Sequence, residues 1–321
     1  MKKLFFIVLL FAGVFTANAQ HQINSFFNAN GTVRLETQEL KEASDTLASV
    51  FHRTEDIVWS RYIYRVIDMR YKQNYQLYFP VTSADPQYRN LFKVMLDAIV
   101  NDTSVHVYEK SQEPGDIKPR LETPLAKDQI PGLLNTDREG ISDGDIATSD
   151  YMLIHYDSVT DKMSFNDYMY QQYVRNQLKF MILEIVFFDK HYSRLFSKII
   201  AIAPMSSEDI EGEDTPIMDA LYQSIRFWVV YDDFRPYMAR QYMIPQSNDS
   251  KRVTFEQFFA QKLYTSYIIG DSNMYDRMLA QAVTRGRDEQ EDKAIIEKEL
   301  KKEQQRIENE LMTFELDLWE Y

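Results

Sequence analysis

Two apolar runs in the middle of the chain constrain its fold more than any other feature. Lys179–Phe188 and Leu195–Ala203 are almost wholly apolar, and the polar segment Asp189–Arg194 separates them. Runs of this length, bounded by polar residues and by Pro204, are typical of two strands joined as an antiparallel hairpin. Amphipathic helical patterns lie on both sides of the hairpin. The sequence therefore predicts an α+β fold in which helices pack on an antiparallel sheet.

The N-terminus has the layout of a secretory signal peptide. Met1–Lys3 is cationic, Leu4–Phe15 is apolar, and Ala17–Ala19 is an A-x-A cleavage site. The apolar run is too short to span a bilayer. The chain contains no cysteine, and Gln20 stands where a lipoprotein needs one. We therefore expect residues 1–19 to be removed and the exported chain to be a periplasmic protein without a lipid anchor or disulfides.

The charge of the chain limits its partners. The sequence has 36 basic and 49 acidic residues, a net charge of −13, and loss of Lys2 and Lys3 leaves 34 basic residues and −15. Such a chain repels nucleic acid phosphates and anionic lipid. The negative charge is consistent with a basic partner. It is equally consistent with a charge that only keeps the protein soluble. The hydrophobic content of 45% is enough for a packed body.

Local patterns predict further elements around the hairpin. Residues 111–150 hold four prolines and four glycines, so we expect a long loop there. Strand patterns cover Ser104–Glu109, Tyr151–Tyr156 and Ile225–Tyr231. N-cap and periodicity signals predict helices over Thr37–Phe51, Thr54–Met69, Asp85–Val100, Ser164–Gln177 and Thr254–Ile268, with capping boxes at Ser164–Asp167 and Thr254–Gln257.

The C-terminal part of the chain has a different composition. Sixteen of the 26 residues 285–310 are charged, and pairs such as Glu297 with Lys301 favour a solvated, partly frayed helix over 285–303. A seam follows in which apolar residues recur at helical spacing: Ile307, Leu311, Phe314 and Leu318. We expect these last turns to dock on the body or on a neighbour. The expected organisation is a signal peptide over 1–19, an N-terminal extension over 20–53, a body over 54–284 and a helical tail over 285–321.

Motifs that carry catalysis are missing from the sequence. The five histidines form no metal-binding pair, and no nucleotide, dinucleotide or nucleophile-elbow motif occurs. We therefore expect no enzyme activity, no cofactor and no metal. Two alternatives stay open. A pair of carboxylates can hydrolyse cell-wall glycan without any sequence motif. The acidic loop with Asp137, Glu139, Asp143 and Asp145 has oxygen ligands for calcium, although its spacing departs from the EF-hand pattern.

Aromatic residues gather in three segments, around residues 59–79, 228–237 and 255–267, with arginines between them. Tyrosine, tryptophan and arginine are enriched at protein interfaces. Aromatic side chains also fill ordinary cores, and the sequence does not separate the two roles.

The same segments resemble the gliding motility protein GldN family, also called PorN. The resemblance covers roughly Thr54 to Arg277 and rests on short motifs in a fixed order: Asp56–Arg61, Ile67–Arg70 with Lys72 and Asn74, Leu77–Pro80, Phe227–Pro236, Asn248–Asp249, Arg252, Phe255–Phe259, Ser266–Ile268 and Ser272–Arg277. The residues that it marks as structural or interacting are Trp59, Arg61, Asp68, Arg70, Pro80, Trp228, Tyr231, Arg235, Pro236, Tyr267, Asn273, Tyr275, Asp276 and Arg277.

The resemblance implies a structural function. Members of this family are periplasmic components of the type IX secretion system, associated with gliding motility. The family forms a ring at the inner face of the outer membrane with a lipoprotein of the GldK/PorK type, and it meets the GldM/PorM motor protein. No catalytic residue is implied, so the resemblance predicts a non-enzymatic ring subunit that is attached to the membrane through its partner.

Overall fold

The structure is a computed structural model, and it describes residues 46–47, 52–82, 87–102, 104–111, 116–134, 153–206, 224–245, 252–272, 278–286 and 292–319. All of these residues belong to one compact unit, Thr46–Tyr321. The predicted signal peptide lies outside the described residues, and so does the acidic loop with Asp137 and Asp145. The predicted helix over Thr37–Phe51 falls there too, apart from Thr46 and Leu47.

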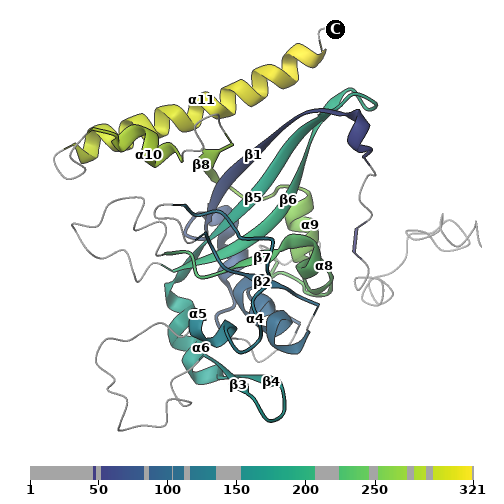
Figure 1. The fold of residues 1–321 in the computed structure, drawn as a ribbon, viewed down its shortest axis with the longest axis vertical. Helices are drawn as coiled ribbons and strands as arrows, with labels where there is room; N and C mark the ends of the chain where they lie inside the picture. The colour runs from purple at the N-terminus through teal and green to yellow at the C-terminus, as the bar shows by residue number, and fades with distance from the viewer. Residues whose placement is uncertain are drawn as a thin grey trace, which may run out of the picture. The chain divides into compact units, whose positions relative to one another are not determined.

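A six-stranded antiparallel sheet in the order β2-β7-β6-β5-β1-β8 forms the centre of the fold (Figure 1). Its strands are β1 Ile57–Asp68, β2 Val107–Tyr108, β5 Gln177–Asp189, β6 Arg194–Ser206, β7 Trp228–Val230 and β8 Tyr267–Asp271. A separate hairpin pairs β3 Ile154–Asp157 with β4 Lys162–Phe165. The α+β fold predicted from the sequence is confirmed, and the strand patterns near 104–109, 151–156 and 225–231 correspond to β2, β3 and β7.

Helices surround this sheet. The α-helices are α3 Tyr75–Tyr78, α4 Leu91–Asn101, α5 Ile130–Leu134, α6 Asp167–Tyr173, α8 Tyr231–Arg240, α9 Phe255–Ala260, α10 Leu279–Thr284 and α11 Lys293–Trp319. Three short 3-10 turns accompany them: η1 Thr54–Asp56, η2 Lys72–Asn74 and η4 Val174–Asn176. Among the described residues, no helix is long and apolar enough to cross a bilayer.

The predicted hairpin is confirmed as β5 and β6, whose pairing runs from Gln177 opposite Ser206 to Asp189 opposite Arg194. Asp189 closes the turn, because its buried carboxylate accepts the backbone N–H of His191 at 2.8 Å. A second acceptor oxygen of Asp189 lies 2.6 Å from His52 Nδ1. Asp189, the first residue of the polar segment predicted as the turn, therefore fixes the turn between the two strands.

The predicted helix over Thr54–Met69 is wrong. Thr54–Asp56 forms only the single turn η1, and β1 then pairs with β5 from Ile57 to Asp68. Isoleucine, valine, tyrosine and tryptophan dominate β1, and such side chains favour a pleated surface. Pairing with β5 on one side and β8 on the other outweighs the N-cap signal at Thr54.

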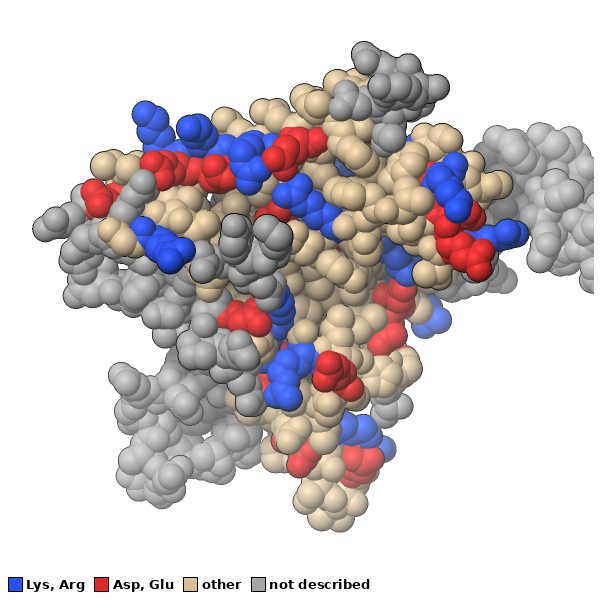
Figure 2. All heavy atoms as spheres, turned by 45° about the horizontal axis from the view of Figure 1, so that its top comes forward, with Lys and Arg blue, Asp and Glu red and all other residues tan. Residues whose placement is uncertain are grey.

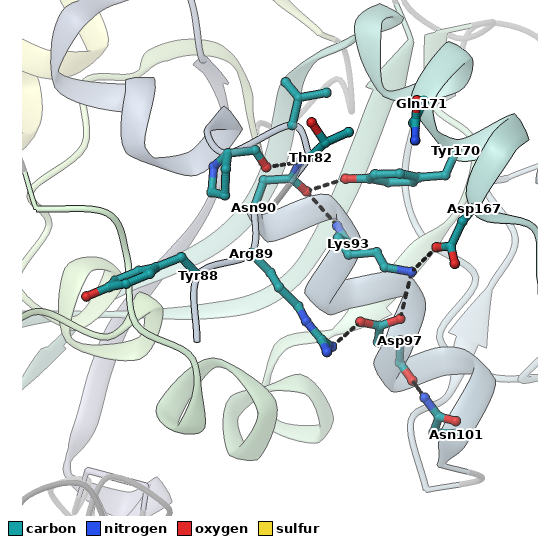
Figure 3. Close-up of a pocket in the computed structure, with 12 residues that line it drawn as sticks. Thr82, Tyr88, Arg89, Asn90, Lys93, Asp97, Asn101, Asp167, Tyr170 and Gln171 are labelled. Carbon is teal, nitrogen blue, oxygen red and sulfur yellow. Dashed lines mark hydrogen bonds and ion pairs between the residues drawn. The ribbon is translucent and has the colours of Figure 1, made fainter. Parts of the chain in front are cut away.

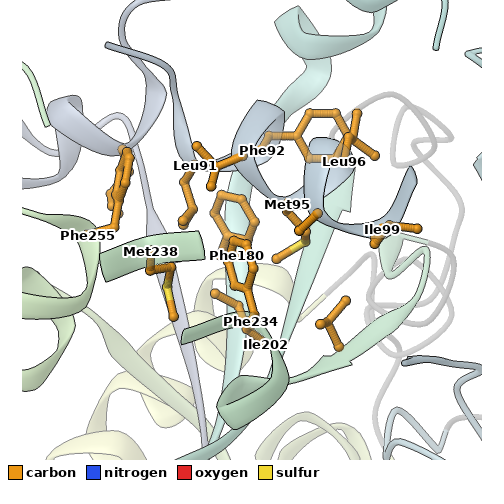
Figure 4. Packing of buried hydrophobic residues seen from close by; sticks show 14 of the residues in the cluster. Leu91, Phe92, Met95, Leu96, Ile99, Phe180, Ile202, Phe234, Met238 and Phe255 are labelled. Carbon is orange, nitrogen blue, oxygen red and sulfur yellow. The ribbon is translucent and has the colours of Figure 1, made fainter. Parts of the chain in front are cut away.

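The main core lies where α4, α8 and α9 cover one face of the sheet (Figure 4). Phe180 of β5 and Ile202 of β6 are fully buried there against side chains such as Met95 and Phe234. The helix predicted from Asp85 begins later, at Leu91, because the Asn90 side chain accepts the Lys93 N–H at 2.8 Å and caps it. A second apolar cluster, with Met181, lies on the other face.

The capping box at Thr254 is confirmed, but its helix is much shorter than predicted. The helix α9 ends at Ala260, and Lys262 has a φ of 51°. The Lys262 N–H donates to Phe259 O and the Leu263 N–H to Phe258 O, which is the bonding of a Schellman motif. The chain then enters β8 at Tyr267, so the last two residues of the predicted helix, Tyr267 and Ile268, belong to a strand.

The helix predicted to start near Ser164 has a different cap. Asn166 accepts the backbone N–H groups of Tyr168 and Met169, whereas Ser164 lies in β4. The helix α6 ends at Tyr173, and η4 completes the segment to Asn176.

The charged C-terminal segment is one continuous helix, α11, from Lys293 to Trp319. It lies beside α10 and β8 (Figure 1). Ile296 and Ile307 are fully buried, and Leu311 packs on the apolar cluster that contains Ile307. Because Ile296 is buried, the first turns of α11 pack on the body with one side and are not fully solvated as predicted. The prediction that the later apolar seam docks on the body is confirmed for Ile307, Leu311 and Phe314.

Candidate interaction surfaces

The start of β1 holds the second half of α11. The Trp59 ring lies 4.9 Å from the Phe314 ring, and Phe188 of β5 contacts Phe314 edge-on at 6.4 Å. Arg61 donates to Glu310 of α11 at 3.1 Å and also to the buried Asp271 at the end of β8. Trp59 and Arg61 were both marked by the sequence resemblance. In this structure they bind the chain's own C-terminal helix.

A buried acid stands next to this junction in the middle of the sheet. Glu184 of β5 is 1% exposed and accepts from Arg65 Nε at 2.9 Å and from Lys262 Nζ at 2.7 Å. Burial raises the pKa of Glu184, but attraction to Lys262 and Arg65 outweighs it, so the pKa lies below its ordinary value. Arg65 also lies 4.0 Å from Glu308 of α11. This ion-pair group joins β1 and β5 to Lys262, which follows α9.

The other end of β1 forms a rigid turn. Asp68 is buried and accepts from the Arg70 N–H at 2.9 Å and from Arg70 Nη2 at 2.5 Å. Burial raises the pKa of Asp68, but these hydrogen bonds outweigh it and the pKa lies below its ordinary value. The fully buried Asn74 donates to Asp68 O at 2.8 Å and to Thr265 O at 2.7 Å, which ties the turn to the segment just before β8.

This turn presents three rings to solvent, Tyr71, Tyr75 and Phe79, which we call the aromatic patch. They are 50%, 48% and 48% exposed. Phe79 meets Tyr75 edge-on at 6.3 Å, and Tyr78 meets Phe79 at 5.0 Å. The next residue, Pro80, accepts from Asn90 Nδ2 at 3.1 Å, which fixes the end of the segment to the cap of α4.

The later motif is mostly core. Trp228 is fully buried and donates from its indole N–H to Ile117 O at 3.2 Å. Tyr231 is buried and meets Phe259 edge-on at 6.0 Å. Tyr267 of β8 is partly buried, and burial together with the nearby Asp68 charge raises its pKa to about 12. These three residues therefore support the fold.

Arg235 of α8 has a different role, because it binds the chain that enters the body from the N-terminus. Its Nη2 donates to Leu47 O at 2.6 Å and to Glu256 Oε1 at 2.8 Å. The buried Glu256 accepts the Leu47 N–H at 3.0 Å. Together the pair binds both backbone groups of one residue. Pro236 follows inside α8, where it supplies no backbone N–H to the helix.

A polar hollow of about 520 Å³ lies between α4 and α6 (Figure 3). Asp97 accepts from Arg89 at 2.5 Å and lies 3.1 Å from Lys93, and Lys93 also contacts Asp167 at 3.3 Å. Tyr170 donates to Asn90 Oδ1 at 2.7 Å at the base of the hollow. The charged groups neutralise one another, so we assign no ligand to this hollow.

The structure thus divides the residues marked by the sequence into groups. Trp59 and Arg61 hold α11, while Asp68, Arg70, Pro80 and Tyr267 surround the turn that carries the aromatic patch. Trp228 and Tyr231 are core, and Arg235 binds Leu47. Asn273, Tyr275, Asp276 and Arg277 lie outside the described residues. Their assignment stays a prediction.

Sequence reasoning missed the buried acids that organise these surfaces, Glu184, Glu256 and Asp271. Glu184 offered one signal, because it is a single charge inside an apolar run and such a residue is paired when it is buried. Within the described ranges, no group of three or more histidine or acidic side chains is placed to hold a metal ion.

The described residues form an α+β protein whose buried acids Asp68, Glu184, Glu256 and Asp271 are bonded to arginine or lysine side chains. The family model described as gliding motility associated protein GldN matches residues 52–320. Because the match covers most of the chain, the chain belongs to the GldN family. It is therefore a component of the gliding motility and type IX secretion machinery. A comparison with curated proteins finds no match.

Proposed function

We propose that this chain is a non-enzymatic structural subunit of the periplasmic ring of the type IX secretion system. In this role it assembles with an outer-membrane lipoprotein of the GldK/PorK type and contacts the GldM/PorM motor protein. The observation that carries the proposal is the family match over residues 52–320. We infer the non-enzymatic function, the ring assembly and these two partners from that membership.

Two features of the chain support the proposed location at the inner face of the outer membrane. Residues 1–19 have the layout of a signal peptide, which directs export. Gln20 follows the cleavage site, so membrane attachment in this proposal comes from the lipoprotein partner.

The surface chemistry also suits a subunit that is held by protein contacts. The aromatic patch combines three half-exposed rings with the exposed Arg70, and aromatic residues and arginine dominate the binding energy of protein interfaces. The alternative of a glycan hydrolase needs two carboxylates that face a substrate. Asp68, Glu184, Glu256 and Asp271 are instead bonded to arginine or lysine side chains. No described carboxylate pair favours the hydrolase over the structural subunit.

The test is native purification of the full chain with a tag after Tyr321, followed by mass measurement of the complex and identification of its members. We expect a megadalton assembly that contains an outer-membrane lipoprotein and a motor component. A monomer recovered alone from the periplasmic fraction would contradict the proposal. Complementation of a deletion strain adds a second readout, because the proposal expects gliding and type IX secretion to be lost and restored together.

A further inference from the structure

The aromatic patch is built to receive a partner with little loss of conformational freedom. Asn74 fixes the turn that carries Tyr71 and Tyr75 through its bonds to Asp68 O and Thr265 O. Rings that are already ordered before contact lose little entropy on binding. Contacts with one another further restrict Tyr75 and Phe79. The patch therefore offers three preorganised apolar anchors.

The border of the patch is basic. Arg70 and Lys72 are both exposed and flank Tyr71 in the sequence. Asp68 neutralises part of the Arg70 charge, since both of its oxygens accept from that guanidinium. Within the described part of the chain, Lys72 has no acidic partner. An apolar partner with acidic neighbours is the chemistry that fits this border.

Such a surface exists on the chain itself, on the outer side of α11. Met312 and Leu316 are 56% and 59% exposed, although the opposite side of the same turns packs on the body. Glu315 is exposed and lies on the same side of the helix, three residues after Met312. We call Met312, Glu315 and Leu316 the α11 stripe. Figure 2 shows the dense mixture of basic and acidic side chains along this helix.

One copy of the chain does not bring the two surfaces together. The α11 stripe lies next to Phe314, which packs on Trp59 at the start of β1. The patch follows Asp68 at the other end of β1. Trp59 and Asp68 lie nine residue steps apart along β1, a distance of about 30 Å at about 3.3 Å per step. Each copy therefore carries one donor surface and one acceptor surface at opposite ends of a strand.

We propose that the α11 stripe of one copy docks on the aromatic patch of a second copy. Met312 and Leu316 contact the rings of Tyr71, Tyr75 and Phe79, and thioether contacts with aromatic rings add to the apolar burial. Glu315 faces Lys72 across the border. The contact joins different surfaces of two identical chains, so it repeats head to tail and closes into a ring where the rotation permits. This inference deepens the proposed function and rests on it.

The chain contains no cysteine, so any disulfide within or between copies must come from cysteines that are introduced. Tyr75→Cys and Met312→Cys are introduced separately into full chains with different tags, and both are expressed together in cells that lack the native chain. After mild oxidation of the native envelope, we expect a disulfide-linked dimer that carries both tags. Val159→Cys is the matched control, because Val159 is 91% exposed and lies outside both surfaces. It should give no dimer with Met312→Cys.

The inference would be overturned if the Tyr75→Cys and Met312→Cys chains gave no more dimer than the Val159→Cys control. It would also be overturned if cells that express only Met312→Cys, or only Tyr75→Cys, gave a disulfide-linked dimer. Such a dimer would mean that two identical surfaces meet. Native purification of the same strains separates this failure from failure of the proposed function. A megadalton assembly without the Tyr75–Met312 link removes only the docking mode, whereas a lone monomer removes both.

Charge exchange gives an independent readout. Lys72→Glu should weaken self-association about two- to fivefold at low salt, because exposed ion pairs contribute up to about 1 kcal/mol. Glu315→Lys in the second partner should restore it. Sedimentation velocity of mixed variants measures the change, and circular dichroism checks that both variants fold. Equal association of Lys72→Glu with the native and the Glu315→Lys chain would contradict the proposed pairing.

Discussion

Removal of the Glu184 carboxylate is the sharpest test of how charge is organised inside this sheet. Glu184→Ala leaves Arg65 without its buried acidic partner, with only the half-exposed Glu308 at 4.0 Å, and Arg65 is itself only 18% exposed. Breaking a buried pair on one side is strongly destabilising because the remaining charge stays desolvated. Lys262 is 53% exposed, so water replaces its lost partner at small cost.

The expected loss in the free energy of unfolding follows from these contacts. A hydrogen bond between charged groups, as from Arg65 Nε at 2.9 Å, contributes about 1.5–3 kcal/mol. The screened Lys262 contact contributes below about 1 kcal/mol. The lost methylene adds about 0.8 kcal/mol. We expect about 3–4 kcal/mol for Glu184→Ala and about 1–2 kcal/mol for Glu184→Gln, which keeps the volume and an acceptor oxygen. Lys262→Met is the matched control at below about 1 kcal/mol.

Equilibrium unfolding in urea measures these differences, and its pH dependence identifies the charge as the cause. The folded pKa of Glu184 is lowered, so the carboxylate adds stability above its ordinary pKa of 4.5 and loses it as pH falls through the folded pKa. The gap between native and Glu184→Gln should be constant above about pH 5 and should narrow below about pH 4.5.

Two results would refute this reasoning. If Glu184→Ala lowered the free energy of unfolding by less than about 1 kcal/mol, water would have to hydrate Arg65 in the variant. The Arg65–Glu184 pair would then not be desolvated in the native protein. A gap between native and Glu184→Gln that stays unchanged down to pH 3 would mean that the effect is one of packing and not of charge.

Three further changes test single contacts. Thr254→Ala removes the capping box of α9 and should cost about 1 kcal/mol in urea unfolding; no change would mean that the box adds nothing to α9. Trp228→Phe leaves Ile117 O without its indole donor and should cost about 1–3 kcal/mol, and a neutral result would place water at that oxygen. Phe314→Ala removes the ring that packs on Trp59 and should raise amide exchange in the last turns of α11. Unchanged exchange there would show that the ion pairs alone hold the helix.

The sequence predicted those elements whose local pattern and tertiary position agree. The hairpin of β5 and β6 is buried along most of its length, so its apolar runs were visible without further information. The capping box at Thr254 was equally clear. The end of α9 was not, because Lys262 takes the left-handed position of the Schellman motif that glycine usually occupies. Without glycine the apolar residues of β8 extended the helical pattern.

Two other errors have a tertiary cause. The segment after Thr54 carries good N-cap chemistry, but its residues become β1 because β5 and β8 pair with both of its edges. No element was predicted over residues 232–241, where the structure has α8, and Pro236 inside this helix is a signal against one. Burial of the helix residues Phe234 and Met238 against the sheet outweighs that loss.

For the candidate surfaces, the sequence identified residue types but not their environment. Trp228 and Tyr75 both belong to aromatic segments, yet Trp228 is fully buried and Tyr75 is half exposed. The difference in exposure depends on which distant segments pack over each ring. The spacing of apolar residues in the sequence does not show which segments these are. Glu256 likewise reads as an ordinary first-turn acid, although it is buried and binds Arg235 and the backbone of Leu47.

The position of β1 in the sheet sets the distance between the two surfaces of the proposed docking. Because β1 pairs with strands on both edges, it does not bend independently of the sheet. The junction with α11 at Trp59 and the patch beyond Asp68 are therefore held at a fixed separation by the sheet itself. In an assembly of identical chains joined through these two surfaces, that separation contributes directly to the spacing between neighbours. Loosening of α11 by Phe314→Ala should then weaken the Tyr75–Met312 cross-link while the patch stays intact. A cross-link of unchanged yield in Phe314→Ala would show that the stripe reaches its partner without support from β1.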